Sequence, residues 1–281
     1  MVEGALTRAP STRRDRLSVV TATIEYLSHL AADGAGFAAA LERADRAASV
    51  PCCPDWEARD LLAHLTRVHW FWNEIVTRRA AHPDETDDEF EPAPSDEALL
   101  AQYREGLDVL VETLRRTDPD VPVWTWDENG TTVAWVRRRQ AHEALIHRVD
   151  AEQTAGTVGP IDRTLAADGV DEVLRVAIAG VPSWGEFTPD GATLRLARTD
   201  GDGHWGVAFG RFTGTSRSGR EYDLDACTVG MDAADPDALI EGSAAALDLW
   251  LWGREPVEKL TVTGDRSLAG RLRSLAAEAT Q

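Results

Sequence analysis

Apolar residues recur every three or four positions along four segments of the first half of the chain, a pattern typical of helices with one buried face. The four segments run over residues 17–47, from Asp55 to Arg79, from Ser95 to Arg116, and over residues 132–152. Asp55 is the expected N-cap of the second helix, because its carboxylate can accept a hydrogen bond from the first turn. Four helices with buried faces predict a four-helix bundle.

After residue 156 the pattern changes to short alternating or apolar runs, which predict β-strands. The runs ATLRLARTD and HWGVAFGRF flank the sequence DGDG, which predicts a hairpin, and YDLDACTVGMDA continues the strand pattern. Residues 236–253 predict a helix, EKLTVTGD a short strand, and the residues from Ser267 a terminal helix. The expected fold is therefore an N-terminal four-helix bundle followed by a smaller α+β domain.

Glycines and a proline between residues 155 and 160 mark the expected domain boundary. The bundle is accordingly expected at residues 17–156 and the α+β domain at residues 157–281. Residues 1–16 are polar, contain a proline and have no apolar period, so they predict a disordered N-terminal tail.

The chain has 281 residues and a formal net charge of −19. Such a charge repels nucleic acid, so no nucleic-acid partner is expected. Two basic runs, at residues 8–16 and 137–139, have the composition of solvated surface. The chain has neither an apolar run long enough for a membrane span nor a signal-peptide pattern, which predicts a cytoplasmic protein with no membrane partner.

Three cysteines occur, of which Cys52 and Cys53 are adjacent and Cys227 is distant. This spacing gives neither a disulfide framework nor a metal-binding CxxC pair, so reduced and partly buried thiols are expected. A catalytic thiol at Cys53 is an alternative, and it requires a neighbouring base or dipole that lowers its pKa.

Glu143 and His147 stand four positions apart in RRRQAHEALIHRVD, so on a helix they share a face and can bind one metal ion. His64, in DLLAHLTRVHWFW, is the best candidate for a third ligand, because it lies beside the apolar stripe of the second predicted helix. Three protein ligands leave a coordination position open, as in catalytic sites. Two histidines and a glutamate favour Zn²⁺ first, although other divalent first-row ions also suit such ligands.

Four motifs occur in order along the chain: VPCCPDW, LLAHLTRVHWFW, RRRQAHEALIHRVDAE and LDLWLWGR. Through them the chain resembles the mycothiol-dependent maleylpyruvate isomerase family of actinobacteria over nearly everything after residue 16. The resemblance implies a DinB-like four-helix bundle and a C-terminal domain similar to sterol-carrier folds, with the family's metal ligands at His64, Glu143 and His147. The chain departs from the family at residues 53–56, where CPDW replaces the common CPGW, at Cys52, and in the acidic segment at residues 82–96.

The resemblance also implies an enzyme in which a divalent metal activates a low-molecular-weight thiol, mycothiol, for attack on a small electrophile. The reaction is then a cis–trans isomerisation or a thiol transfer. Arg254 is the candidate for binding substrate carboxylates, and Arg217 and Arg220 are weaker candidates. A non-catalytic protein that binds a small apolar molecule and a metal-dependent hydrolase stay open as alternatives. A monomer or a small homo-oligomer is expected.

Several further residues lie near the predicted ligands. His69 and His142 are expected to support the ligands or to be exposed, since they point elsewhere on their helices. Asp150 is expected to orient His147 or to pair with Arg148, with a structural ion pair favoured. The tryptophans of these segments are candidates for a pocket wall, although tryptophan in a bundle is more often core; they are Trp70, Trp72, Trp124 and Trp126.

Overall fold

The computed structural model describes residues 24–280, apart from residues 87–89, 128–129, 183, 217 and 231–232. The expected N-terminal tail and the first residues of the first predicted helix lie outside the described residues. So does Arg217.

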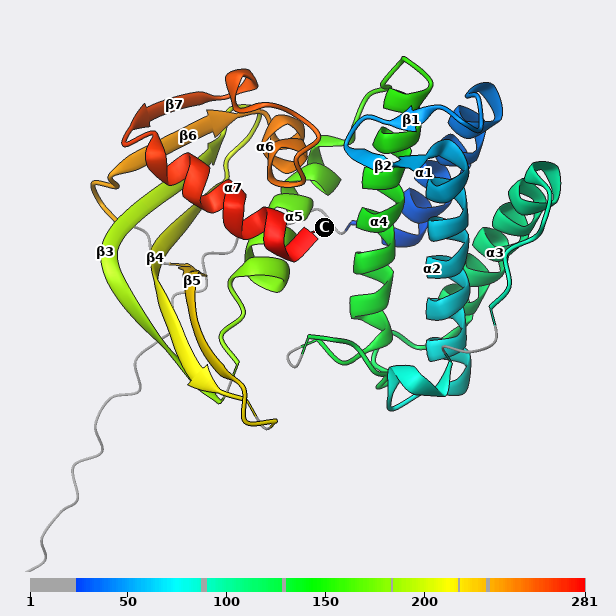
Figure 1. Ribbon diagram of the computed structural model, residues 1–281, viewed down its shortest axis with the longest axis horizontal. Coiled ribbons are helices and arrows are strands. Elements are labelled where there is room, and N and C mark those ends of the chain that lie inside the picture. The colour runs from blue at the N-terminus through cyan, green and yellow to red at the C-terminus, as the bar shows by residue number, and fades with distance from the viewer. Residues whose placement is uncertain are drawn as a thin grey trace, which may run out of the picture.

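The described chain begins with the predicted four-helix bundle (Figure 1). Its helices are α1 (Tyr26–Arg43), α2 (Ala58–Arg78), α3 (Asp96–Arg116) and α4 (Val133–Thr154). Their apolar faces form one core that includes Phe37, Leu65 and Leu110, all fully buried. Ser95 caps α3 through a hydrogen bond from the backbone N–H of Ala98, as its position before the apolar repeat indicates. The bundle is thus confirmed.

The start of α2 differs from the sequence prediction. Asp55 is not its N-cap, because it lies in strand β2 (Cys53–Glu57), which pairs antiparallel with β1 (Ser49–Val50). The N-cap is Glu57, and the Asp60 carboxylate accepts a hydrogen bond from the Glu57 backbone N–H at 2.9 Å, which completes a capping box. A short 3-10 turn, η1 (Pro83–Glu85), follows α2 before the chain enters α3.

The second half contains a five-stranded sheet with the strand order β5-β4-β3-β6-β7. The strands are β3 (Gly185–Arg198), β4 (His204–Thr215), β5 (Glu221–Val229), β6 (Ala238–Gly242) and β7 (Thr261–Gly264). β3 and β4 form the predicted antiparallel hairpin around the DGDG sequence. The terminal helix α7 (Ser267–Thr280) is present, and η3 (Val257–Lys259) precedes β7. An α+β fold is therefore confirmed for this half.

Two elements of this half correct the sequence prediction. The single helix expected over residues 236–253 is wrong in its first part, because residues 238–242 form β6, which pairs with β3 on one side and β7 on the other. Helix α6 (Ala244–Leu251) begins only after its N-cap Ser243. The sequence also did not reveal α5 (Arg163–Glu172), which Asp162 caps and which continues as a π-helical segment, η2 (Val173–Ile178).

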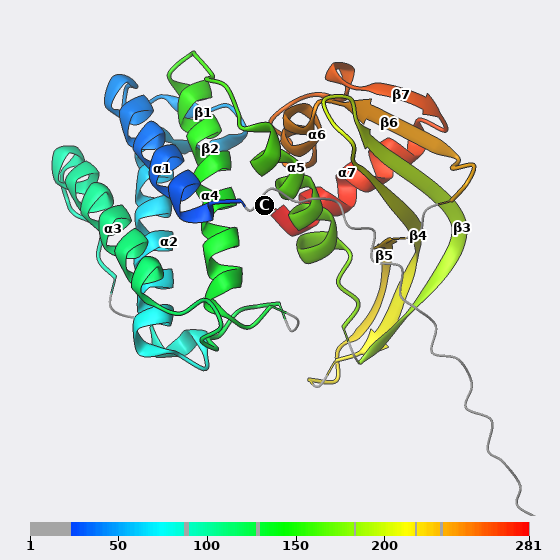
Figure 2. The same ribbon diagram turned by 180° about the vertical axis from the view of Figure 1, so that it is seen from behind.

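Helix α4 lies between the rest of the bundle and the C-terminal domain (Figures 1 and 2). α5 and α6 lie between the sheet and α4 in both views. Apolar contacts join α4 to both helices, since Leu145 packs near Leu165 of α5, and Ile146 and Val149 pack near Leu249 of α6. α4 is therefore buried on both faces, and its polar residues meet partners from both domains. None of the described helices has the length and apolar character that a membrane span requires.

Candidate metal centre

The three predicted metal ligands come together between α2 and α4. Each of His64, Glu143 and His147 has a potential ligand atom, and these three atoms lie within 4.8 Å of one another. His147 Nε2 lies 3.2 Å from Glu143 Oε2, and the ring centroids of His64 and His147 are 4.9 Å apart. The spacing of four residues on α4 brings Glu143 and His147 onto one face, and the bundle brings His64 to meet them.

The donor set fits a divalent ion. Burial and the charge of His147 lower the pKa of His64 to about 4, so its imidazole is neutral near pH 7 and offers a lone pair. Burial alone would raise the pKa of Glu143, but the charge of Arg139 and a hydrogen bond with His147 hold it well below its usual range. Two imidazoles and one carboxylate are a common ligand set of catalytic zinc sites.

Asp150 fixes the orientation of His147. The Asp150 carboxylate is fully buried, and its Oδ2 lies 3.0 Å from His147 Nδ1. Burial alone would lower the pKa of His147, but hydrogen bonds with Asp150 and Glu143 raise it to about 9. With Nδ1 bonded to Asp150, the other ring nitrogen is turned toward Glu143 and the centre. A carboxylate behind a metal-binding histidine is a common arrangement that sets the direction of the ring.

The expected pairing of Asp150 with Arg148 is wrong. Arg148 instead pairs with Asp33 and with Glu152, at 2.9 and 3.1 Å. The partner of Asp150 is Arg254, which follows the end of α6 and donates from Nε and Nη2 to the two carboxylate oxygens, both at 2.9 Å. Arg148 Nη2 also donates to the carbonyl oxygen of Pro160 at 3.2 Å, so Arg148 joins α1 and the end of α4 to the segment between the two domains.

Arg254, the candidate for binding substrate carboxylates, is thus already engaged. Its Nη1 also donates to the carbonyl oxygen of Trp252 at 2.6 Å, and its side chain is only 7% exposed. A guanidinium carries five N–H donors, so two donors remain beyond these three bonds. The weaker candidate Arg220 lies with its guanidinium over the ring of Tyr222, 5.0 Å from the centroid, beside the first residue of β5.

The vicinal cysteines are free and half-buried, as expected. Cys52 Sγ lies 3.1 Å from both Asp150 Oδ1 and Gln153 Oε1, and its single S–H can donate to either oxygen. Burial and the Asp150 carboxylate raise the pKa of Cys52 to about 12, and burial raises that of Cys53 as well. Both shifts favour the protonated thiol at neutral pH, so the alternative of a catalytic Cys53 gains no support from its surroundings.

Arg139 is a residue of this centre that the sequence interpretation missed. Its Nε lies 3.3 Å from Glu143 Oε1, and its Nη1 donates to Glu172 at the end of α5. Its guanidinium also lies over the ring of Trp252, 5.3 Å from the centroid. The solvated surface expected for residues 137–139 is therefore wrong, because α5 covers this part of α4. The signal was present, since Arg139 and Glu143 have the four-residue spacing of a helical ion pair.

The other two histidines of these helices lie away from the candidate ligands. His142 Nε2 lies 2.8 Å from Asp168 on α5. His69 is fully buried and stacks on Tyr103, with ring centroids 5.2 Å apart, and burial lowers its pKa to about 3. Surface exposure, one of the two roles expected for them, is wrong for both. Each belongs to the packing of the bundle or to its contact with α5.

Most of the candidate wall tryptophans pack together instead of around the ligands. Trp72 contacts Trp124 and Trp126, with ring centroids 6.2 and 5.6 Å apart, and Trp70 packs on Phe90. The tryptophan next to a ligand is Trp56 of β2, whose ring centroid is 5.0 Å from that of His64. No sequence pattern singled out Trp56, because its position depends on the β1–β2 hairpin.

A cavity of about 420 Å³ is lined in part by Cys52 and Arg254, the residues that hydrogen-bond Asp150. Cys52 and Gln153 line it from the bundle, and Gly253 and Arg254 line it from the C-terminal domain. Three of these residues also hold Asp150 or hydrogen-bond one another, since Gln153 Nε2 donates to the Arg254 carbonyl oxygen at 3.1 Å. The cavity thus lies between the two domains. Asp150 connects it to His147, because Asp150 bonds both His147 and two of the lining residues.

Comparison with known proteins agrees with this architecture. The sequence matches the family models described as the mycothiol maleylpyruvate isomerase N-terminal domain, over residues 27–152, and the MDMPI C-terminal domain, over residues 164–271. Among curated proteins, none is similar enough in sequence to count as a relative.

Solved structures extend the agreement to the fold. The crystal structure of mycothiol-dependent maleylpyruvate isomerase matches with a TM-score of 0.55 at 15% identity, and that of a point mutant with a TM-score of 0.53 at 16% identity. Each match covers 86% of this chain and 93% of the other. At such identity the structures show a shared fold, while the two family models cover both domains in order. The chain therefore belongs to the mycothiol-dependent maleylpyruvate isomerase family.

Proposed function

We propose that the protein is a metal-dependent enzyme that activates a low-molecular-weight thiol, mycothiol, for attack on a small electrophile. The reaction is a cis–trans isomerisation of the maleylpyruvate isomerase type or a thiol S-transfer. The observation that carries the proposal is the convergence of His64, Glu143 and His147, whose ligand atoms lie within 4.8 Å. Family membership supports a thiol-dependent isomerase in general terms.

A divalent ion held by these three residues, Zn²⁺ in the first instance, would lower the pKa of a coordinated thiol so that it is a thiolate at neutral pH. The chain's own residues prepare the site for this role. His64 is neutral, Glu143 is ionised, and Asp150 holds His147 so that Nε2 faces the other two ligands. His147 Nε2 and Glu143 Oε2 lie 3.2 Å apart, and both would have to be free of a shared proton to bind a metal ion, so metal binding should be weaker at low pH.

The need for an external thiol follows from the cysteines. Cys52 and Cys53 keep their protons at neutral pH, since burial raises the pKa of both. The raised pKa values support a nucleophile from outside the chain. In an isomerisation, the thiolate adds to an activated cis double bond, the resulting single bond rotates, and the thiolate leaves again to give the trans product.

Arg254 is the proposed contact for a substrate carboxylate. Its two unused N–H donors and its place beside Asp150 and the cavity at the seam of the domains support this role. Its bonds to Asp150 fix the guanidinium in one orientation, so a substrate anion would meet a prearranged donor.

The test begins with the metal content of the purified protein, measured for the wild type and for the variants His64→Ala and Glu143→Ala. About one ion per chain is expected in the wild type and very little in either variant. His82→Ala is the matched control, because the His82 side chain is 64% exposed and pairs with the neighbouring Asp84. The control should keep its metal.

Mycothiol is then titrated into the protein loaded with Co²⁺, and a thiolate-to-metal charge-transfer band is expected. A metal-bound wild type that gives no such band would favour the hydrolase alternative, in which water takes the open position. Metal that persists in both ligand variants, or a folded wild type that binds none, would refute the proposed centre and leave the non-catalytic binding protein.

A further inference from the structure

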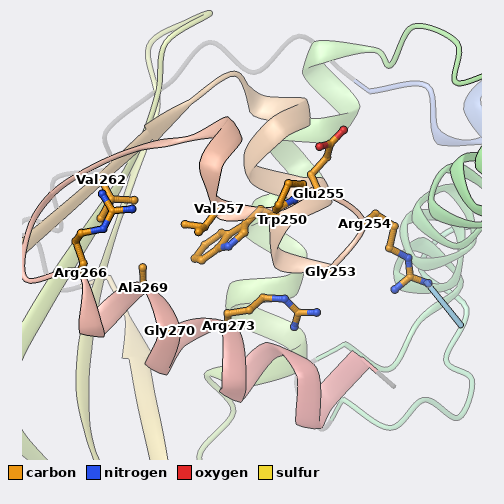
Figure 3. A pocket seen from close by; sticks show the side chains of 11 residues that line it. Trp250, Gly253, Arg254, Glu255, Val257, Val262, Arg266, Ala269, Gly270 and Arg273 are labelled. Carbon is orange, nitrogen blue, oxygen red and sulfur yellow. The ribbon is translucent and has the colours of Figure 1, made fainter. Parts of the chain in front are cut away.

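A larger cavity, of about 630 Å³, lies in the C-terminal domain between the end of α6, β7 and α7 (Figure 3). Its wall is largely apolar and includes Trp250, Val257 and Val262. Arg254 contributes to the rim, but its guanidinium points away and is bound to Asp150. None of the candidate metal ligands lines this cavity, so it is a separate feature of the molecule.

Arg273 of α7 places a positive charge in this wall without an anionic partner. Its Nη1 is buried and has no hydrogen-bond partner in the part of the chain that the structure describes. Gly253, with φ of 75°, lets the guanidinium lie against the backbone, because a Cβ at that position would collide with it. Burial and the charge of Arg254 lower the pKa of Arg273, as expected for a cation that has lost water without gaining an anion.

The other charged residues of the wall do not neutralise Arg273. Arg266 adds a second cation, and Glu255 is the single carboxylate among the lining residues. No ion pair joins either arginine to Glu255 or to any other residue of the described ranges within 4.0 Å. The wall therefore has two uncompensated guanidinium groups in a chain whose formal net charge is −19.

We propose that this cavity binds a small organic carboxylate with an apolar body. The carboxylate pairs with the Arg273 guanidinium, whose planar N–H fork matches it, and Arg266 adds attraction at the rim. The apolar body lies against Trp250, Val257 and Val262. Neither Arg273 nor Arg266 has a carboxylate partner among the described residues, so a bound carboxylate supplies the counter-charge that the wall lacks.

The site requires no metal and goes beyond the proposed thiol chemistry. Calorimetric titration of the full-length protein with hexanoate, and separately with hexanol, tests it directly. Hexanoate should bind at least ten-fold more tightly than hexanol, since a charged hydrogen bond contributes about one to two powers of ten in affinity. Equal binding of the two probes, or no binding of hexanoate, would overturn the proposal.

Variants on one helix locate the site. Arg273→Ala should weaken hexanoate binding at least ten-fold, whereas Arg271→Gln should change it less than two-fold, because Arg271 pairs with Asp190 and Asp225 instead of facing the cavity. Both substitutions remove one positive charge from α7, so a general charge effect would weaken both alike and would refute the assignment to Arg273.

A cavity-filling variant tests whether loss of hexanoate binding in Arg273→Ala comes from the lost contact or from misfolding. Gly270 lines the cavity on α7, and a Cβ added there meets no atom within 4 Å. Leucine favours a helix more than glycine does, so Gly270→Leu should fold and still abolish hexanoate binding.

His64→Ala should bind hexanoate as the wild type does, and this outcome does not depend on the proposed metal chemistry. Loss of hexanoate binding in His64→Ala would place the anion at the metal centre and overturn the separate site.

Discussion

The candidate metal centre and the cavity of the C-terminal domain differ in whether their charged side chains have partners of opposite charge. At the centre each charged group has a partner: His147 bonds Asp150, Asp150 bonds Arg254, and Arg139 joins Glu143 to Glu172. In the cavity, Arg273 Nη1 has no hydrogen-bond partner among the described residues. We call the first region a completed network because each of its charged groups lies beside one of opposite charge, although Arg139 Nε and Nη2 make no hydrogen bond. The second region has cationic groups without matching anions.

The two regions therefore suit different ligands. The network at the candidate centre is arranged for a metal ion, whereas the cationic wall of the cavity is arranged for an anion. A completed network fixes the direction of each candidate ligand atom, so that a metal ion would meet a preformed site with little reorganisation. An uncompensated charge beside an apolar wall lowers the stability of the free protein and gains most when an anion enters. Substitutions in the two regions should therefore change stability in different directions.

Asp150→Ala should have the largest effect. It leaves the buried guanidinium of Arg254 without its carboxylate and removes the group that orients His147. Breaking one side of a buried ion pair costs about 3–5 kcal/mol in the free energy of unfolding. Metal affinity should also fall about 10- to 100-fold, as for other carboxylates behind a ligating histidine. Urea unfolding and metal titration measure the two effects.

Glu97→Gln is the matched control for Asp150→Ala, since Glu97 is an exposed acid in the first turn of α3. It should change the free energy of unfolding by less than about 0.5 kcal/mol. If Asp150→Ala changed the free energy of unfolding as little as this control does, the ion pairs around His147 would not be what holds the candidate ligands in place.

Arg139→Ala should come next. It removes the cation between Glu143 and Glu172, of which Glu172 is only 2% exposed. Loss of charged hydrogen bonds costs about 1.5–3 kcal/mol per bond broken, and the ionised Glu143 loses its main electrostatic support.

The double variant Arg139→Met with Glu172→Met decides whether pairing is the cause. The pair sits among apolar contacts of α4 with α5 and α6, so the double variant should be more stable than Arg139→Met alone. Additive losses in a double-mutant cycle would contradict a direct interaction between the two residues.

The rate at which Cys52 is alkylated should show how strongly the network around Asp150 suppresses the reactivity of this thiol. The pKa of Cys52 is raised to about 12, so near pH 8 it carries a far smaller thiolate fraction than an ordinary cysteine. Alkylation of Cys52 by iodoacetamide at pH 8 should be more than 100-fold slower in the folded protein than in urea, and should accelerate as pH rises toward 12.

Mass spectrometry of the labelled peptides follows Cys52 and Cys53 separately. Asp150→Asn is the informative variant, because it removes the negative charge that helps to raise the pKa of Cys52. Faster labelling of Cys52 is expected there. Rapid labelling of Cys52 in the folded wild type would reopen the alternative of a thiol that takes part in catalysis.

The sequence predicted those features that depend on local spacing. Ser95 before an apolar repeat marked the start of α3, and the four-residue spacing on α4 placed Glu143 and His147 on one face. Bundle packing then brought His64 to them. These inferences needed only helical periodicity and the expectation that apolar faces meet.

The sequence did not predict the features that depend on contacts between domains. Arg254 and Asp150 are 104 positions apart, and no spacing rule connects them. Residues 238–242 looked helical beside the apolar α6, but pairing with β3 and β7 makes them a strand. Arg139 looked like surface because α5, the helix that covers it, was itself not recognised.

Arg273→Met should have the smallest effect on stability and the opposite sign to Asp150→Ala. Methionine keeps the apolar part of the side chain and removes a guanidinium nitrogen that is buried without a hydrogen bond. The free energy of unfolding should stay the same or rise by about 0.5 kcal/mol, since such a change removes a desolvation cost and breaks no bond of that nitrogen. Arg254→Met, measured in parallel by urea unfolding, should instead lose stability, because it leaves the buried Asp150 carboxylate without its guanidinium. Equal losses in the two variants would mean that Arg273 is held as tightly as Arg254, and the contrast between a completed network and an open cationic wall would not hold.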